Sequence, residues 1–173
     1  MSKMISVLAI ILVFLSSCNE TGKIDMEEHK YAQYLVDEFI ESLNNQDKER
    51  LETLFSKNAL DNSDDFNNQF NALNECIGDS IVSYDFDGCL ATSMSVDYGD
   101  KTNMIRFGFM VTTSENETYN VFIIAYNIDT VNEDNLGVYM LETANSDYHY
   151  YKSWQERMTP GIVILKSEDI ASI

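Results

Sequence analysis

Few side chains in this chain of 173 residues could carry out covalent or acid–base chemistry. There are three cysteines, Cys18, Cys76 and Cys89, and two histidines, His29 and His149. A cysteine thiolate can be alkylated, oxidised or used as a nucleophile, and a histidine can act as a general base near neutral pH. The sequence around each residue indicates which of these uses is open to it.

Cys18 follows a short targeting segment. Lys3 gives this segment a positive start, and residues 5–15 form an almost unbroken apolar run. The run is shorter than the roughly 20 residues that span a bilayer, so it fits the core of a signal peptide. The Leu-Ser-Ser-Cys sequence that ends at Cys18 resembles the lipobox of bacterial lipoproteins. This resemblance implies cleavage of a signal peptide of residues 1–17 and attachment of a diacylglycerol to the Cys18 sulfur.

The lipobox resemblance also implies a location. Palmitate-type acyl chains on Cys18 would anchor the protein to the extracytoplasmic face of a cell membrane, because two or three chains bind a bilayer stably. Residues 18–26 are polar after the cysteine and are predicted to form a tether. No Asp follows Cys18, which would favour the outer membrane in a bacterium with two membranes. An ordinary secretory signal with an incidental cysteine is the alternative.

Cys76 and Cys89 are the remaining cysteines, and outside the cytoplasm two such residues can form a disulfide. Cys76 ends a predicted helix and Cys89 follows a predicted turn, so the two could come close. Two buried thiols are the alternative. No Cys-x-x-Cys or His-x-x-x-His spacing indicates a zinc site.

The histidines do not indicate a catalytic site. His29 lies among charged residues of a predicted first helical turn, His149 lies between tyrosines, and no Gly-x-Ser-x-Gly elbow is present. Asp61, Ser63 and Asp65 alternate as in a calcium loop, but the glycine and glutamate that such a loop needs are replaced by Phe66 and Ala72. The sequence therefore predicts no metal and no cofactor, and it leaves catalytic residues unknown.

The overall charge excludes some partners. With 29 acidic and 11 basic residues the net charge is −18, and such a surface repels nucleic acid and anionic lipid. Hydrophobic residues make up 45% of the chain, which is enough for a core. The length and the lack of a Pro- or Gly-rich linker predict one domain, residues 27–165, and a C-terminal tail of residues 166–173.

Helical periodicity comes first in this domain. Residues 25–43 are predicted to form a helix with Asp25 as its N-cap and Glu27 and Glu28 in its first turn. A second helix over 50–56 would be capped by Asp47. A third helix is predicted from a cap near Asp64 to Ile77, with Gly78 as the residue that follows it. The apolar stripe of the first helix contains Ala32, Leu35, Val36, Phe39, Ile40 and Leu43.

Strand periodicity follows. Candidate strands lie at residues 80–84, 90–98, 104–113, 118–129, 138–143 and 162–165, the last as an edge strand. The alternation over 90–98 is typical of a half-buried strand. Helices followed by antiparallel strands predict an α+β fold with the helices on one face of a curved sheet of about four to five strands.

This order of elements resembles the nuclear-transport-factor-two-like (cystatin-like) cone, and more narrowly a group of bacterial lipoproteins of unknown function that contain it. The resemblance includes the stretch NNQDKERLETLFSKNA and the closing strand LGVYML. It implies a pocket between the sheet and the first helix. Because this fold hosts enzymes, carriers and interaction modules, it does not identify a reaction.

The two longest strands are apolar on both faces. Phe107 and Phe109 point to one side, while Met104, Met110 and Phe122 point to the other. The far face must therefore be covered, either by residues 148–165 or by a second copy, which would give a homodimer through the sheet face.

Three functions remain open at this level, and one of them is a structural subunit that works through its sheet face. The first is a lipid-anchored extracytoplasmic binding or interaction domain without catalysis, with a small ligand or a protein as its unknown partner. The alternative is an enzyme of the cone fold that uses an Asp, Tyr or His acid–base site. A buried, strongly perturbed carboxyl or histidine beside a tyrosine would favour the enzyme.

Overall fold

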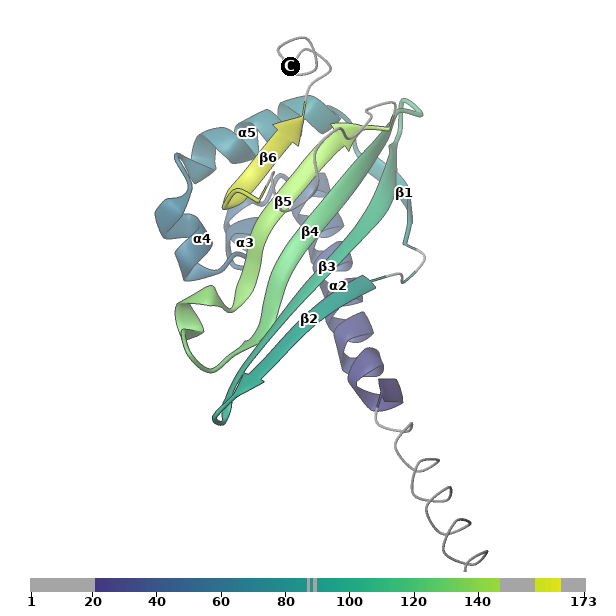
Figure 1. The fold of residues 1–173 in the computed structure, drawn as a ribbon. Coiled ribbons are helices and arrows are strands. Elements are labelled where there is room, and N and C mark those ends of the chain that lie inside the picture. Colours follow the sequence, from purple (N-terminus) through teal and green to yellow (C-terminus); the bar gives the residue numbers. More distant parts are fainter. Residues whose placement is uncertain (1–20, 87, 89, 147–157, 166–173) are drawn as a thin grey trace, which may run out of the picture.

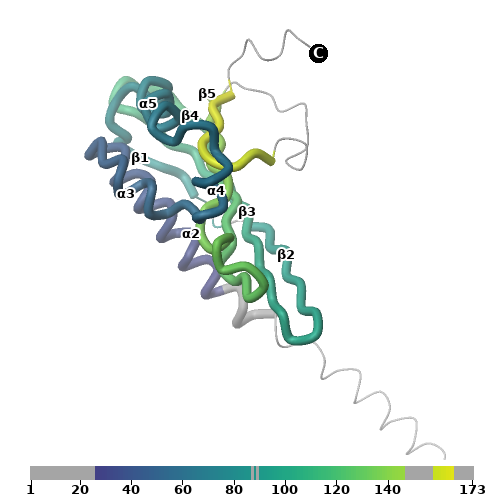
Figure 2. Tube along the Cα trace, turned by 90° about the vertical axis from the view of Figure 1, so that its left-hand side faces the viewer, coloured from purple at the N-terminus to yellow at the C-terminus, as the bar shows by residue number. Residues whose placement is uncertain are grey.

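The computed structural model describes residues 21–86, 88, 90–146 and 158–165. The predicted α+β fold is confirmed, because the N-terminal helices form one layer and a curved, mostly antiparallel sheet forms the other (Figures 1 and 2). The helices in chain order are α2 (Thr21–Asn44), α3 (Lys48–Glu52), α4 (Lys57–Asn62) and α5 (Phe66–Ile77).

Helix α2 crosses the face of the sheet that we call the inner face. Its apolar stripe is buried as predicted, and the Phe39 ring meets Phe109 of the sheet edge-to-face at 5.6 Å between centroids. The described helix begins at Thr21 rather than at Asp25. The expectation that Glu27 and Glu28 lie in the first helical turn is therefore wrong.

The later helices begin at side-chain caps. Asp47 accepts a hydrogen bond from the Arg50 N–H at 2.9 Å, as predicted, but α3 ends at Glu52. A separate helix, α4, follows with Ser56 as its cap, so the single helix expected over 50–56 is wrong. Asp65 caps α5, and Gly78 follows that helix with φ 73°, as expected for a C-terminal glycine.

The sheet has six strands, one more than the largest number expected. The order is β1-β3-β4-β5-β6, and β2 pairs with β3 on the same edge as β1. Strand β6 is an edge strand, as predicted, but it runs parallel to β5. A 3₁₀ turn, η1 (Glu133–Asn135), joins β4 to β5. The strand bounds are β1 (Ile81–Asp85), β2 (Leu90–Asp97), β3 (Asp100–Thr113), β4 (Thr118–Asp129), β5 (Gly137–Asn145) and β6 (Gly161–Leu165).

The core lies between the helices and the inner face. Helix α2 packs under β1 and β3, whereas α4 and α5 pack under β5 and β6. Apolar side chains of alternate strand residues fill the space between the layers, including Ile105, Phe107, Phe109, Val111, Val121, Ile123, Val138, Leu141 and Ile162. This layer positions the polar groups described below.

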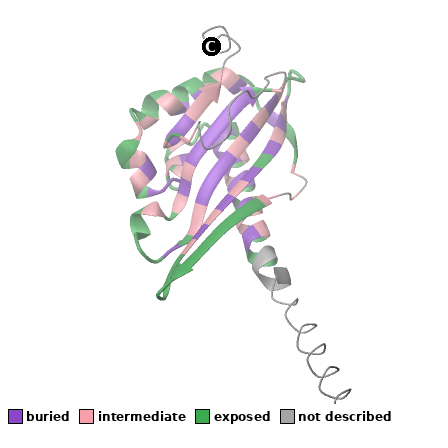
Figure 3. Ribbon diagram, viewed as in Figure 1, coloured by how far each residue is buried: buried purple, intermediate pink, exposed green. Residues whose placement is uncertain are grey.

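Strand β2 departs from the sequence prediction. The strand forms where expected, but every residue from Ala91 to Asp97 is exposed, as the green ribbon in Figure 3 shows. The prediction of a half-buried strand is therefore wrong for this chain alone. The physical reason is that no described helix covers the inner face at β2, so its apolar side chains face solvent.

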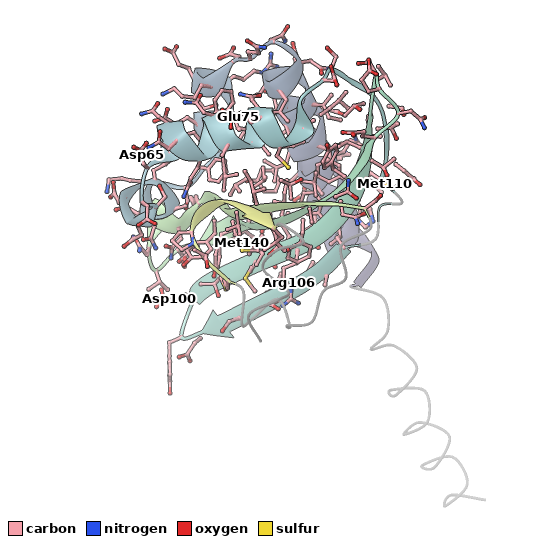
Figure 4. All side chains as sticks on the ribbon, turned by 90° about the horizontal axis from the view of Figure 1, so that it is seen from above. Asp65, Glu75, Asp100, Arg106, Met110 and Met140 are labelled. Atoms are coloured by element: carbon pink, nitrogen blue, oxygen red, sulfur yellow. The ribbon has the colours of Figure 1, made fainter. Side chains whose placement is uncertain are left out.

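The far face, which we call the outer face, is buried at its centre. Ile124, Met140 and Ala144 are fully buried there, as the apolar pattern on both faces predicts. Of the segment expected to cover this face, residues 148–157 lie outside the described residues. Within the described part, the Thr159 N–H donates to the Met140 Sδ at 3.4 Å. Figure 4 shows Glu75 on α5, Asp65 at the N-terminal end of that helix, and Arg106 on the opposite side of the sheet.

Candidate functional site

A buried carboxylate lies near the N-terminal end of α2. Glu28 occupies the next position of the apolar stripe that continues with Ala32 and Leu35, and only 3% of it is exposed. Its Oε1 accepts a hydrogen bond from the Nδ2 of Asn103 on β3 at 2.5 Å. Burial of a carboxylate is costly unless hydrogen bonds compensate for the lost water, so this pair is an energetically demanding feature of the interior.

Two amide oxygens lie in the same part of the sheet. The β3–β4 register shifts at Asn103, so Asn127 lies in the bulge beside it. Among the described residues, the Oδ1 atoms of Asn103 and Asn127 are buried and accept no hydrogen bond. Together with Glu28 they form a set of acceptor groups, which we call the Glu28 cluster. These oxygens could accept hydrogen bonds from a donor, but neither of the two hollows described below opens at this cluster.

Asp129 is a buried carboxylate at the end of β4, but it stabilises a loop. Its Oδ1 accepts from the backbone N–H groups of Val131 and Asn132, and its Oδ2 accepts from the Asn135 side chain at 2.8 Å. Burial raises the pKa of Asp129, but these hydrogen bonds outweigh burial and hold the pKa below its ordinary value. A saturated carboxylate with a lowered pKa is a poor general base.

The tyrosines near the sheet are stabilised in their neutral form. Burial raises the pKa of Tyr126, and the neighbouring Tyr139 and Asp129 raise it further. Burial also raises the pKa of Tyr31 to about 12. In Tyr119 burial and a hydrogen bond to Glu117 raise the pKa. Phenols with raised pKa values remain protonated at neutral pH, so they can donate hydrogen bonds but do not act as bases.

A third buried carboxylate lies on the outer face. Glu142 of β5 is fully buried and lies between Phe122 of β4 and Val163 of β6 in the ladders. Arg106 of β3 is on the same face and is half-buried. The sequence pattern did not indicate Glu28, Asn103 or Glu142 as site residues. For Glu28 a signal existed, because it is at helical spacing from Ala32 and Leu35.

Exposed polar contacts link the helices to one another and to the sheet. Arg50 of α3 binds both carboxylate oxygens of Glu38 on α2, at 2.6 and 2.9 Å, and it also binds Glu41. The Arg50 hydrogen bond lowers the pKa of Glu38. Gln33 donates to Asp37 and to the hydroxyl of Tyr84 on β1. These contacts fix α2 to its neighbours, and exposed pairs of this kind contribute little to stability.

Two hollows lined by described residues lie at the rim of the fold. One of about 170 Å³ lies between the ends of α2 and α5, where Asn44, Asn74 and Asp79 are among its lining residues. A shallow one of about 460 Å³ lies along α3 and α4. Neither opens between α2 and the inner face, where the fold resemblance implies a pocket.

The cysteines and histidines singled out from the sequence are not brought together. Cys76 is half-buried near the end of α5. Because Cys18, Cys89 and His149 lie outside the described residues, both the lipidation and the disulfide remain predictions. His29 packs beside Gly88. Across the described part of the chain, no group of three His, Cys, Asp or Glu side chains could hold a metal ion.

The residues that resembled a calcium loop have structural roles, as the sequence indicated. Asp61 pairs with Lys57 at 2.6 Å, the Ser63 hydroxyl donates to the Leu60 carbonyl, and Asp65 caps α5.

In residues 21–86, 88, 90–146 and 158–165, the structure has no helix with the length and apolar character needed to cross a membrane.

Comparison with known proteins identifies one family. The model of a domain of unknown function (DUF5104) matches residues 38–146, which is more than half of the chain. The matched region runs from the middle of α2 to the end of β5 and includes Asn103, Asp129 and Glu142, whereas Glu28 precedes it. No curated protein matches the chain.

Proposed function

The chain belongs to the family of the domain of unknown function DUF5104, and from this premise we propose that it is a lipid-anchored binding or interaction domain on the extracytoplasmic face of a membrane. The proposal includes the nuclear-transport-factor-two-like cone as its fold. A helix that crosses the inner face of a curved antiparallel sheet, with shorter helices beside it, supports that fold.

The Leu-Ser-Ser-Cys sequence at Cys18 is the observation that carries the proposal. Signal peptidase would leave Cys18 as the N-terminal residue, and its acyl chains would contribute about 0.8 kcal/mol for each buried CH₂ group. Helix α2 begins at Thr21, shortly after this cysteine, so the domain would lie close to the bilayer. Figures 1 and 2 show the N-terminal end of α2 at the same end of the molecule as the β2–β3 turn.

Binding rather than catalysis is favoured by the groups near the core. The Glu28 cluster offers buried acceptors, while Asp129 is saturated by its own loop. A ligand with several N–H or O–H donors, such as a polyol or an amine, has the chemistry that would satisfy these acceptors. Such a ligand is also compatible with the negative charge of the protein.

The anchor is tested by metabolic labelling with an alkyne-tagged fatty acid in a bacterium that expresses the full chain. We expect label on the wild type and on Cys76→Ser, which is the matched cysteine control, but none on Cys18→Ser. Mass spectrometry of the mature N-terminal peptide should show an acylated Cys18. An unmodified mature N-terminus, or label that persists in Cys18→Ser, would contradict the proposal.

An enzyme of the cone fold is the second candidate, and Glu28 is the observation that favours it. A buried carboxylate with one oxygen held by Asn103 resembles an acid–base group more than any other described side chain does. The test is incubation with small-molecule extracts followed by mass spectrometry. Consumption of a compound by wild type and by Asp37→Asn, but not by Glu28→Gln, would support the enzyme and reverse the preference for pure binding.

A further inference from the structure

The outer edge of β2 lacks the features by which edge strands usually avoid pairing. It has eight residues, contains no proline, lysine or arginine, and pairs with β3 without a register shift. Strand β1, on the same edge of β3, has five residues and a bulge, while β6 at the other edge packs against α5. Among the described strands, β2 therefore has an edge that can accept another strand.

The hairpin turn determines which backbone groups face this edge. Tyr98 and Gly99 form a two-residue loop with φ 48° and 101°, so Asp97 and Asp100 should be the hydrogen-bonded pair that closes the hairpin. Hydrogen-bonded and non-bonded pairs alternate in an antiparallel ladder. The N–H and C=O groups of Thr92, Met94 and Val96 therefore point away from β3, toward the open edge.

These groups define one favourable arrangement, and we propose that β2 pairs with β2 of a second copy, antiparallel and centred on Met94. In this register Met94 lies opposite Met94, Thr92 opposite Val96, and Leu90 opposite Tyr98 of the other copy. About six backbone hydrogen bonds join the two chains, two for each bonded pair. The two sheets become one continuous sheet through their edges, so this dimer differs from one through the sheet face.

The side chains along β2 fit this partner. Met94 is 48% exposed, Val96 is 60% exposed and Tyr98 is fully exposed. Their register with β3 places Met94 and Val96 on the inner-face side, beyond the cover of α2. Pairing brings apolar side chains opposite one another, and such cross-strand pairs stabilise a sheet. The alternation typical of a half-buried strand then has a physical explanation.

Charge also favours a second copy at this edge. The chain carries −18 overall, so most of its surface repels an identical molecule. The hairpin of residues 90–107 contains two acidic residues, Asp97 and Asp100, and two basic residues, Lys101 and Arg106, so its net charge is zero. In the proposed register Asp97 lies opposite Ala91 and does not face another acidic side chain.

The first test is the mass of the full chain in detergent solution, measured by analytical ultracentrifugation over a range of concentrations. We expect a monomer that becomes a dimer of twice the mass as concentration rises. Thr92→Pro removes an N–H that points to the open edge and that β3 does not use, so it should abolish the dimer without lowering the thermal stability of the monomer. Met94→Lys should do the same by placing two positive charges opposite each other.

The second test is disulfide cross-linking of the full chain under mild oxidation. Opposed hydrogen-bonded residues have Cα atoms about 5.5 Å apart, within the range of a disulfide, so Met94→Cys should give a dimer on a non-reducing gel. Ser93→Cys is the matched control on β2, and Val131→Cys is a more exposed control elsewhere. A chain that stays monomeric at every concentration, or cross-linking through Ser93 or Val131 as strong as through Met94, would overturn the proposal.

Discussion

The two edge strands of the sheet, β6 and β2, lie in different environments. Strand β6 has five residues, lies against α5 and is held by the Gln69 side chain, whose Oε1 accepts from the Ile162 N–H at 3.0 Å. Strand β2 is longer, with eight residues, yet its side chains from Ala91 to Asp97 are all exposed. The longer edge is therefore the less protected one, which is the reverse of what sheet edges usually show.

This difference arises from where the helix layer ends. Buried positions of α2 run from Leu43 to Glu28, and the stripe packs against β1 and β3, whereas β2 is exposed from Ala91 to Asp97. Helices α4 and α5 extend the layer under β5 and β6. Coverage by helices, and not strand length or pattern, thus determines which edge stabilises the single chain and which remains available for a partner.

Removing a ring from the covered region should have the largest effect on stability. Phe39 is fully buried and packs against Phe109, so Phe39→Ala leaves a cavity in the core. The free energy of unfolding should fall by about 3–5 kcal/mol. Urea denaturation followed by circular dichroism measures this loss. A fall of less than about 1 kcal/mol would mean that α2 does not pack on the sheet as described.

Alanine substitution of two glycines compares the stability of the covered start of β5 with that of the exposed β2–β3 turn. Gly137 and Gly99 both have positive φ, 115° and 101°. A Cβ on Gly137 would lie 2.8 Å from the Leu54 carbonyl oxygen, whereas one on Gly99 would meet nothing within 4 Å. Gly137→Ala should therefore cost more than the about 1–3 kcal/mol of backbone strain that Gly99→Ala also incurs. If Gly137→Ala and Gly99→Ala lowered thermal stability by the same amount, the close contact at Gly137 would not contribute and the prediction would be wrong.

Much of the fold was predictable from local patterns. Strand β4 has the bounds that its alternation predicts, and Asp47 and Gly78 lie at helix ends as their residue types indicate. Local chemistry determines these features. Helix α4 was missed because Ala59 is its only buried residue, so it has no apolar stripe to recognise.

Other features depend on contacts between distant segments. Periodicity over 90–98 shows which residues of β2 share a face, but it does not show whether another element covers that face. The parallel pairing of β6 depends on the path of the chain after β5. Glu28 was assigned to a first turn because the predicted helix began too late, and its partner Asn103 is far away in sequence.

Acid should weaken the loop after β4 through Asp129, a buried carboxylate whose loop packs against α4. Its pKa is held below the ordinary value in the folded state, so the carboxylate stabilises the fold above the unfolded pKa of about 3.9. This contribution is lost as pH falls through the folded pKa. Asp129→Asn should cost about 1–2 kcal/mol near neutral pH, where the carboxylate accepts three hydrogen bonds.

The gap in thermal stability between wild type and Asp129→Asn should then narrow as the pH is lowered below about 4. Asp134→Asn in the same loop is the control, because that exposed carboxylate contacts Lys57 at 3.4 Å and makes no loop-closing bonds in the described structure. If the difference in thermal stability between wild type and Asp129→Asn did not change with pH, the prediction would be contradicted. The substitution would then act through packing or hydrogen-bond geometry and not through loss of the negative charge.

The smallest effect is expected on β2 itself. Met94 and Val96 are exposed, so Met94→Ala and Val96→Ala should each change the free energy of unfolding by less than about 0.5 kcal/mol in dilute, monomeric protein. Urea denaturation at two protein concentrations makes the comparison. At the higher concentration a dimer would add stability that both variants lack, since association stabilises the folded chain by mass action. A loss of stability that is the same at both concentrations would mean that β2 supports the single chain, and the contrast between the two edges would then disappear.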